Sequence, residues 1–154
     1  MSAEARIQEL NLDLPSPPPP GGVYQPIIIT GNLAYISGHG PLKGDGTYII
    51  GRVGEDLDLE AGKAAARQTG LALLSTIRAG LGSLDRVKQV VKTLGLVNSH
   101  ANFRDQPQVI NGYSELFRDV FGEKAGVGAR SAIGTNVLPG NIPVEIEVIL
   151  EIEP

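Results

Sequence analysis

Two residues near the end of the chain have the chemistry to bind a small acid and to activate water. Arg130 stands in the sequence Ala129-Arg130-Ser131, and a planar guanidinium can bind a carboxylate through two parallel hydrogen bonds. Glu145 can orient a water molecule and accept its proton. The alternatives are an ordinary salt bridge for Arg130 and a solvated strand face for Glu145, with Glu147 as a second candidate base.

The segments that carry these two residues predict strands. From Val144 to Ile152 apolar residues alternate with glutamates, apart from Ile149, so the apolar side chains face a core and the carboxylates share the other face. A Pro-Gly-Asn turn precedes this run. The pattern predicts a hairpin that brings Arg130 close to the start of the glutamate row.

The rest of the chain predicts an α+β domain of two layers. Two β-rich runs flank a Gly-Asn pair, which is typical of a hairpin, and two segments carry apolar stripes at helical spacing. The remaining expected elements are strands 27–30, 33–37, 47–53 and 87–97 and helices 59–81 and 107–121, with a glycine-rich loop over 122–128. Two helices suffice to cover one face of one mixed β-sheet.

The start of the chain is expected to be a lead-in and not part of the chemistry. Pro15 and Pro17–Pro20 cannot join a helix or a central strand, so they predict a stiff surface segment. A short helix or edge strand is expected around residues 5–12. We therefore expect an N-terminal segment over 1–22 and a single domain over 23–154, which should fold when the chain begins at Gly21.

Composition narrows the classes of function. The 154 residues carry a formal charge of −4 without a long basic run, which disfavours nucleic acid as a partner. With no cysteine and only two isolated histidines, no thiolate chemistry, disulfide or metal site is expected. The polar N-terminus and the lack of a long apolar segment predict a cytoplasmic protein without a membrane span.

An ordered set of short motifs resembles the Rid family, the reactive intermediate deaminases also called YjgF-like proteins. The motifs are Tyr24, Ser37-Gly38-His39, Asn111-Gly112-Tyr113-Ser114-Glu115-Leu116-Phe117, Ala129-Arg130-Ser131, Leu138-Pro139 and Glu145-Ile146-Glu147. The spacing of the last three is that of the deaminase branch, and the resemblance runs from about residue 24 to residue 152.

This resemblance implies a fold and an activity. The fold is chorismate-mutase-like, and it assembles as a homotrimer with clefts between neighbouring subunits. Deaminating members hydrolyse enamines and imines such as 2-aminoacrylate to 2-keto acids and ammonia, without a metal or an organic cofactor. In this chain the resemblance makes Arg130 and Glu145 the catalytic residues.

The resemblance also implies five substrate-binding positions: Tyr24, Gly38, His39, Asn111 and Ala132. Tyr24 is either an aromatic wall of the cleft or a packing residue, and Asn111 either reaches a neighbouring cleft or lies in an interface. Gly38 lets backbone N–H groups approach a ligand, and Ala132 is expected to act through its backbone N–H. His39 is either a titrating site residue or a polar surface group.

Three departures indicate a divergent subfamily. The turn reads Ser-Gly-His where relatives have Ser-Gly-Gln, Ala132 replaces a frequent cysteine, and residues 121–128 lack the usual proline. These departures bear on the identity of the substrate more than on the fold. The other candidate functions are a 2-keto acid sensor, the endoribonuclease role ascribed to some relatives, and a structural trimer. Having both Arg130 and Glu145 favours an enzyme, because binding alone needs only Arg130.

Overall fold

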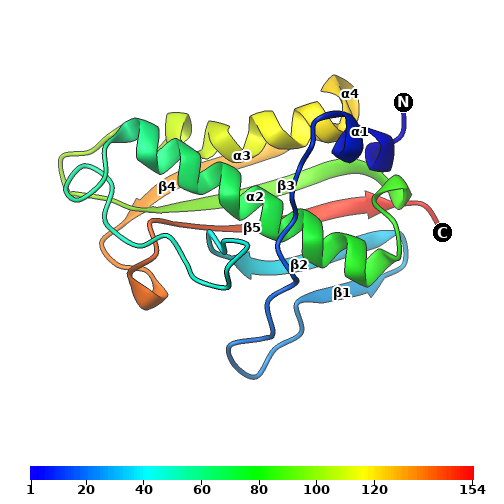
Figure 1. Cartoon of the computed structure of the whole chain (residues 1–154), viewed down its shortest axis with the longest axis horizontal. Coiled ribbons are helices and arrows are strands. Elements are labelled where there is room, and N and C mark those ends of the chain that lie inside the picture. The colour runs from blue at the N-terminus through cyan, green and yellow to red at the C-terminus, as the bar shows by residue number, and fades with distance from the viewer.

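The computed structural model describes residues 1–154 and contains one five-stranded sheet with the strand order β1-β2-β5-β3-β4 (Figure 1). The strands are β1 (Ile27–Thr30), β2 (Leu33–His39), β3 (Val87–Asn98), β4 (Ala129–Thr135) and β5 (Val144–Ile152). The helices are α1 (Ala3–Glu9), α2 (Leu59–Leu81), α3 (Gln106–Phe121) and the short α4 (Glu123–Gly126), with 3₁₀ turns at Leu84–Arg86 and Pro139–Asn141.

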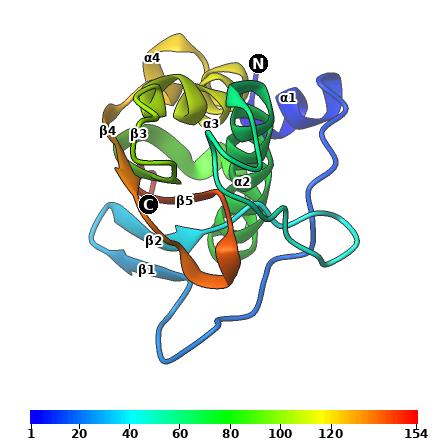
Figure 2. The ribbon, with the colours of Figure 1, turned by 90° about the vertical axis from the view of Figure 1, so that its left-hand side faces the viewer.

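Helices α2 and α3 cover the same face of the sheet, which confirms the predicted two-layer α+β arrangement (Figure 2). Helix α2 begins at the Asp58 cap, whose carboxylate accepts the Ala61 N–H at 2.8 Å, and ends at Gly82 in the left-handed conformation. The two helices pack very closely, since a Cβ on Gly112 would clash with the Lys63 carbonyl oxygen. Apolar side chains of both helices and of β5 form one core.

The predicted hairpin between residues 129–135 and 144–152 is wrong. Strand β4 pairs with β3 in parallel, and β3 lies between β4 and β5. Helix α3 is the crossover that a parallel pair requires. The turn at Pro139–Asn141 carries the chain past the end of β3, so that β5 enters the sheet antiparallel to β3 on its far side.

The strand expected over 47–53 is also absent. This stretch makes only isolated bridges, such as Leu42 with Tyr48 and Val53 with Ser99. Gly51 has φ 128°, which breaks the extended run, and its N–H donates to the Asn141 carbonyl. The result is a loop that runs from the end of β2 to the start of α2 and holds Tyr48 near the β2 terminus.

The N-terminal segment packs against the same core as the rest of the domain. Ala3 and Ile7 of α1 are buried, and the Glu4 carboxylate pairs with Arg78 at 2.6 Å. The polyproline stretch then crosses α2, where the buried Ser75 hydroxyl donates to the Pro15 carbonyl at 2.5 Å (Figure 1). These contacts count against the expectation that residues 1–20 are dispensable for folding.

None of the helices is both long enough and apolar enough to cross a bilayer.

Candidate functional site

Arg130 lies on the helix-covered face of the sheet and is held by two neutral groups. Its register partner on β3 is Thr93, which in turn pairs with the buried Val148 of β5. Its Nη1 donates to Asn111 Oδ1 at 2.8 Å and to Ser114 Oγ at 3.1 Å, both on α3. No carboxylate of the chain forms an ion pair with this guanidinium. The salt-bridge alternative is therefore not what the structure shows.

A cavity of about 230 Å³ opens at this guanidinium. It is lined by residues of β3, α3 and the glycine-rich loop, including Thr93, Tyr113 and Gly128. The buried Tyr113 hydroxyl lies 2.9 Å from Thr93 Oγ1, and burial raises the pKa of Tyr113 despite that hydrogen bond and the nearby Arg130 charge. Tyr113 therefore stays neutral, and Arg130 supplies the positive charge of this cavity.

Glu145 lies on the opposite face of the sheet from Arg130. It pairs with Leu96, three residues beyond Thr93 on β3, so its side chain points away from the helices. It is half-buried, and burial raises its pKa, with a further contribution from the charge of Glu147. A single chain thus does not bring the two predicted catalytic side chains together.

Gly38 contacts Glu145 directly. A Cβ on Gly38 would lie 2.6 Å from Glu145 Oε1, so no larger residue fits without moving the carboxylate. The sequence predicted a small residue here for the approach of a ligand to the backbone. The structure shows that the absent side chain also makes room for Glu145.

His39 is buried, and its side chain is fully engaged. Its Nδ1 lies 2.6 Å from the Ser37 carbonyl oxygen, which can only accept, so Nδ1 carries the proton. Its Nε2 lies 2.7 Å from Thr76 Oγ1 and accepts from that hydroxyl. Burial lowers the pKa of His39, with the Ser37 hydrogen bond opposing it. The surface reading of His39 is wrong.

Tyr24 is half-exposed and lies beside the end of β2. Its hydroxyl accepts the Gly21 N–H at 3.0 Å. Together with prolines of the lead-in, Gly38 and Tyr48, it lines a hollow of about 120 Å³. Sequence reasoning missed Tyr48, because the stretch around it was assigned to a strand.

The predicted site residues therefore form two groups within one chain. Asn111 contacts Arg130 directly, and Ala132 lies on the same face of β4 as Arg130, against the core. Tyr24 and Gly38 gather instead around the end of β2, where Gly38 meets Glu145.

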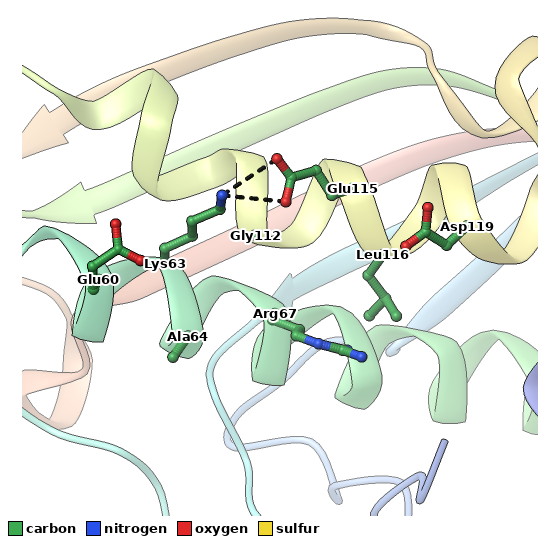
Figure 3. Close-up of a pocket in the computed structure, with 8 residues that line it drawn as sticks. All are labelled: Glu60, Lys63, Ala64, Arg67, Gly112, Glu115, Leu116 and Asp119. Atoms are coloured by element: carbon green, nitrogen blue, oxygen red, sulfur yellow. Dashed lines mark hydrogen bonds and ion pairs between the residues drawn. The ribbon is translucent and has the colours of Figure 1, made fainter. Parts of the chain in front are cut away.

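A separate hollow of about 300 Å³ lies between α2 and α3 and contains none of the predicted catalytic residues (Figure 3). Charged side chains line it, and the Lys63 ammonium contacts the Glu115 carboxylate at 3.3 Å. These charges are solvated and of both signs, so the hollow favours no particular ligand. His, Asp and Glu side chains of the chain form no group of three suited to a metal ion.

Comparisons with protein families, with known proteins and with solved structures point to the same family. The model of the family described as "YjgF/chorismate mutase-like, putative endoribonuclease" matches residues 4–151. Protein TCP17 of Trypanosoma cruzi is 38% identical over 148 residues, which is 96% of this chain and 92% of TCP17.

Two solved structures extend the comparison. That of Atu1372 from Agrobacterium tumefaciens, described as of unknown function, is 38% identical with a TM-score of 0.89, covering 99% of this chain and 92% of Atu1372. RidA from the Antarctic bacterium Psychrobacter sp. PAMC 21119 is 27% identical with a TM-score of 0.64, over 89% of this chain and 94% of RidA. With the five-stranded sheet and its helix layer, these matches show that the chain belongs to the YjgF/chorismate-mutase-like family, as a divergent member.

Proposed function

We propose that this protein is a cofactor-free hydrolase that converts small enamine or imine carboxylates, such as 2-aminoacrylate, into 2-keto acids and ammonia. The observation that carries the proposal is Arg130. Two neutral side chains hold one end of its guanidinium, and no carboxylate of the chain neutralises it, although it borders a cavity. A positive planar group in this state is suited to bind the carboxylate of a small acid.

Glu145 is the proposed base. Burial and Glu147 raise its pKa, which brings the carboxylate closer to the operating pH at which a general base works best. An enamine such as 2-aminoacrylate first becomes its imine tautomer, as a proton leaves the nitrogen and another is added to the methylene carbon. Glu145 then accepts a proton from water as the water oxygen bonds to the imine carbon. That proton then passes to the nitrogen, the C–N bond breaks, and the hydroxyl proton of the intermediate also leaves with ammonia. The water oxygen remains as the keto oxygen.

A cleft that combines the two groups of site residues would draw them from two copies of the chain. Since Arg130 and Glu145 lie on opposite faces of one sheet, we propose a homotrimer in which each cleft takes Arg130 and Asn111 from one protomer and Glu145, Gly38 and Tyr24 from its neighbour. Exposed apolar side chains on the sheet support association, because a monomer would leave them in water. They are Ile28, Tyr35 and Ile133.

The names of relatives point to two activities. RidA, the name of one structural neighbour, agrees with imine hydrolysis, whereas the family description names an endoribonuclease. The formal charge of −4 disfavours the second activity, since phosphate binding depends on clustered Lys and Arg. A keto acid sensor would need Arg130 but not Glu145.

The test is to incubate the protein with freshly generated 2-aminoacrylate and to measure ammonia and pyruvate. Release of both above the solvent rate is expected, with no cleavage of single-stranded RNA by the same preparation. Tight pyruvate binding without faster release of ammonia and pyruvate would contradict the hydrolase function and support the sensor function.

A further inference from the structure

We infer that Tyr48, together with Tyr24 and the polyproline segment, forms a subsite that receives the substrate's side chain and selects branched or aromatic chains over a bare methylene. This inference rests on the proposed function and names the class of substrate that the site takes. Neither Tyr48 nor the prolines have a part in the proposed chemistry.

The hollow beside Tyr48 has the shape and the lining of a side-chain pocket. It measures about 120 Å³, and it is lined by Pro18, Pro19 and Pro20, by the two tyrosines, and by residues at the end of β2. A dry cavity of about 150 Å³ is known to hold benzene. The hollow is somewhat smaller than that cavity, but it is far larger than the methylene of 2-aminoacrylate requires and can take a branched chain or part of a ring.

The hollow lies next to the proposed base. Gly38 lines it and also contacts the Glu145 carboxylate, with its Cβ position 2.6 Å from Oε1. A substrate whose imine carbon lies at Glu145 can thus extend its side chain past Gly38 into the hollow. The carboxylate of the same substrate is left free for Arg130 of the neighbouring protomer.

Both walls of the hollow are fixed in place. The Ser75–Pro15 hydrogen bond fastens the polyproline segment to α2, and the Tyr24 hydroxyl binds the Gly21 N–H at 3.0 Å. On the other side the Tyr48 ring packs over Gly40, whose Cβ position lies 3.3 Å from Cε1 of that ring. A preformed pocket of this kind discriminates between side chains without the cost of ordering its walls.

The lining is uncharged. Proline and phenol rings contribute apolar and aromatic surface beside the polar atoms of the phenol hydroxyls and the backbone, and no carboxylate or ammonium lines the hollow. Burial and the nearby Tyr24 both raise the pKa of Tyr48, so the Tyr48 phenol remains neutral at physiological pH. An imino acid with a charged side chain is therefore excluded from the preferred class.

The experiment measures binding of two product-like probes, phenylpyruvate and pyruvate, by calorimetry on the full-length protein. The wild type should bind phenylpyruvate more tightly. Tyr48→Ala should weaken phenylpyruvate binding by about tenfold or more, the range for losing apolar pocket contacts, and leave pyruvate nearly unchanged. Tyr48→Phe keeps the ring and should keep the preference. Ile50→Ala is the matched control, since Ile50 is exposed in the same loop and does not line the hollow.

Tyr48→Trp provides a second variant if Tyr48→Ala unfolds. Its larger ring fills the hollow, so this variant should bind phenylpyruvate more weakly and leave pyruvate binding nearly unchanged. Equal affinity of the wild type for both probes, or an unchanged preference in both Tyr48 variants, would overturn the subsite. If that happened while 2-aminoacrylate was still hydrolysed, the proposed function would stand alone. A preference for phenylpyruvate that depends on Tyr48, without any hydrolysis, would support the subsite and contradict the proposed hydrolase function.

Discussion

The carboxylate of Glu145 occupies the space that a side chain on residue 38 would need. A methyl group on Gly38 would lie 2.6 Å from Oε1 of Glu145, closer than real Cβ contacts, and 3.0 Å from Cδ, which is a tight contact. The end of β2 therefore positions the proposed base from a neighbouring strand. This contact explains why a glycine at the strand end matters for chemistry as well as for backbone approach.

Gly38→Ala should displace the Glu145 carboxylate and lower turnover by about tenfold or more, as small misplacements of catalytic groups do. Binding of pyruvate should change less, because Arg130 holds the keto acid carboxylate. The matched control is Gly44→Ala, since nothing lies within 4 Å of the added methyl group there. Comparing kcat and pyruvate affinity for both variants tests this. Equal kcat in both would remove Gly38 from the positioning of Glu145.

Asn111→Asp should weaken the binding of a substrate carboxylate by Arg130. The amide oxygen that accepts from Nη1 at 2.8 Å would become a carboxylate, which satisfies the guanidinium within the chain. We expect pyruvate affinity to fall by about tenfold or more, the scale of one charge-assisted hydrogen bond. Asn102→Asp, in an exposed turn, adds the same charge away from the cavity and should leave affinity unchanged. Calorimetry on both variants decides the matter, and retained affinity in Asn111→Asp would place the carboxylate elsewhere.

Ile7→Ala should destabilise the fold by about 2 kcal/mol, the lower end for truncating a buried isoleucine. Ile7 is buried in the same core as the sheet, although it lies before the polyproline segment. Urea unfolding of this variant beside the exposed-site control Gln8→Ala measures the difference. A chain that begins at Gly21 should lose at least as much stability. Identical urea midpoints for Ile7→Ala and the wild type would show that the N-terminal helix docks without contributing to the free energy of unfolding.

Stability should fall as the pH drops below the ordinary pKa of histidine. Burial lowers the pKa of His39 in the folded state below its ordinary value of 6.5, so between these two values the unfolded chain binds a proton that the folded chain does not. Protonation therefore favours the unfolded state, and the loss begins as the pH falls through 6.5. Melting temperatures between pH 7.5 and pH 5 should show this decline, and His39→Gln should flatten it. A wild-type curve that is flat over this range would contradict the buried, neutral imidazole.

Local patterns predicted the helices and the first hairpin well. Helix α2 has the expected bounds, because its apolar stripe is long and Gly82 ends it in the left-handed conformation. Helix α3 begins one residue before Pro107, as a proline in the first turn indicates. The β1–β2 hairpin is likewise specified by adjacent residues around Gly31.

Features that depend on distant partners were not predictable in this way. Strand β3 lies between β4 and β5 in the sheet. The alternation of apolar and polar residues along one strand does not specify which strands are its neighbours. His39 follows an irregularity in the pairing of β2 with β5, so the alternation of side chains along the strand does not predict that it is buried. Helix α1 has only 7 residues, and its place in the core depends on contacts with α2 and the turn after it.

The most direct test of a site shared between protomers is subunit complementation. Arg130→Lys loses the two-pronged donor geometry, and Glu145→Gln keeps its shape but cannot accept a proton, so each variant alone should retain about 1% of wild-type turnover or less. When the two are unfolded and refolded together, some clefts receive an intact Arg130 from one protomer and an intact Glu145 from its neighbour. Random mixing in equal amounts should restore about a quarter of wild-type activity, because each cleft needs one particular pairing of two subunit types. Activity that stays at the level of the separate variants, in a preparation shown by native mass spectrometry to contain mixed oligomers, would contradict a catalytic site built from Arg130 and Glu145 of different chains.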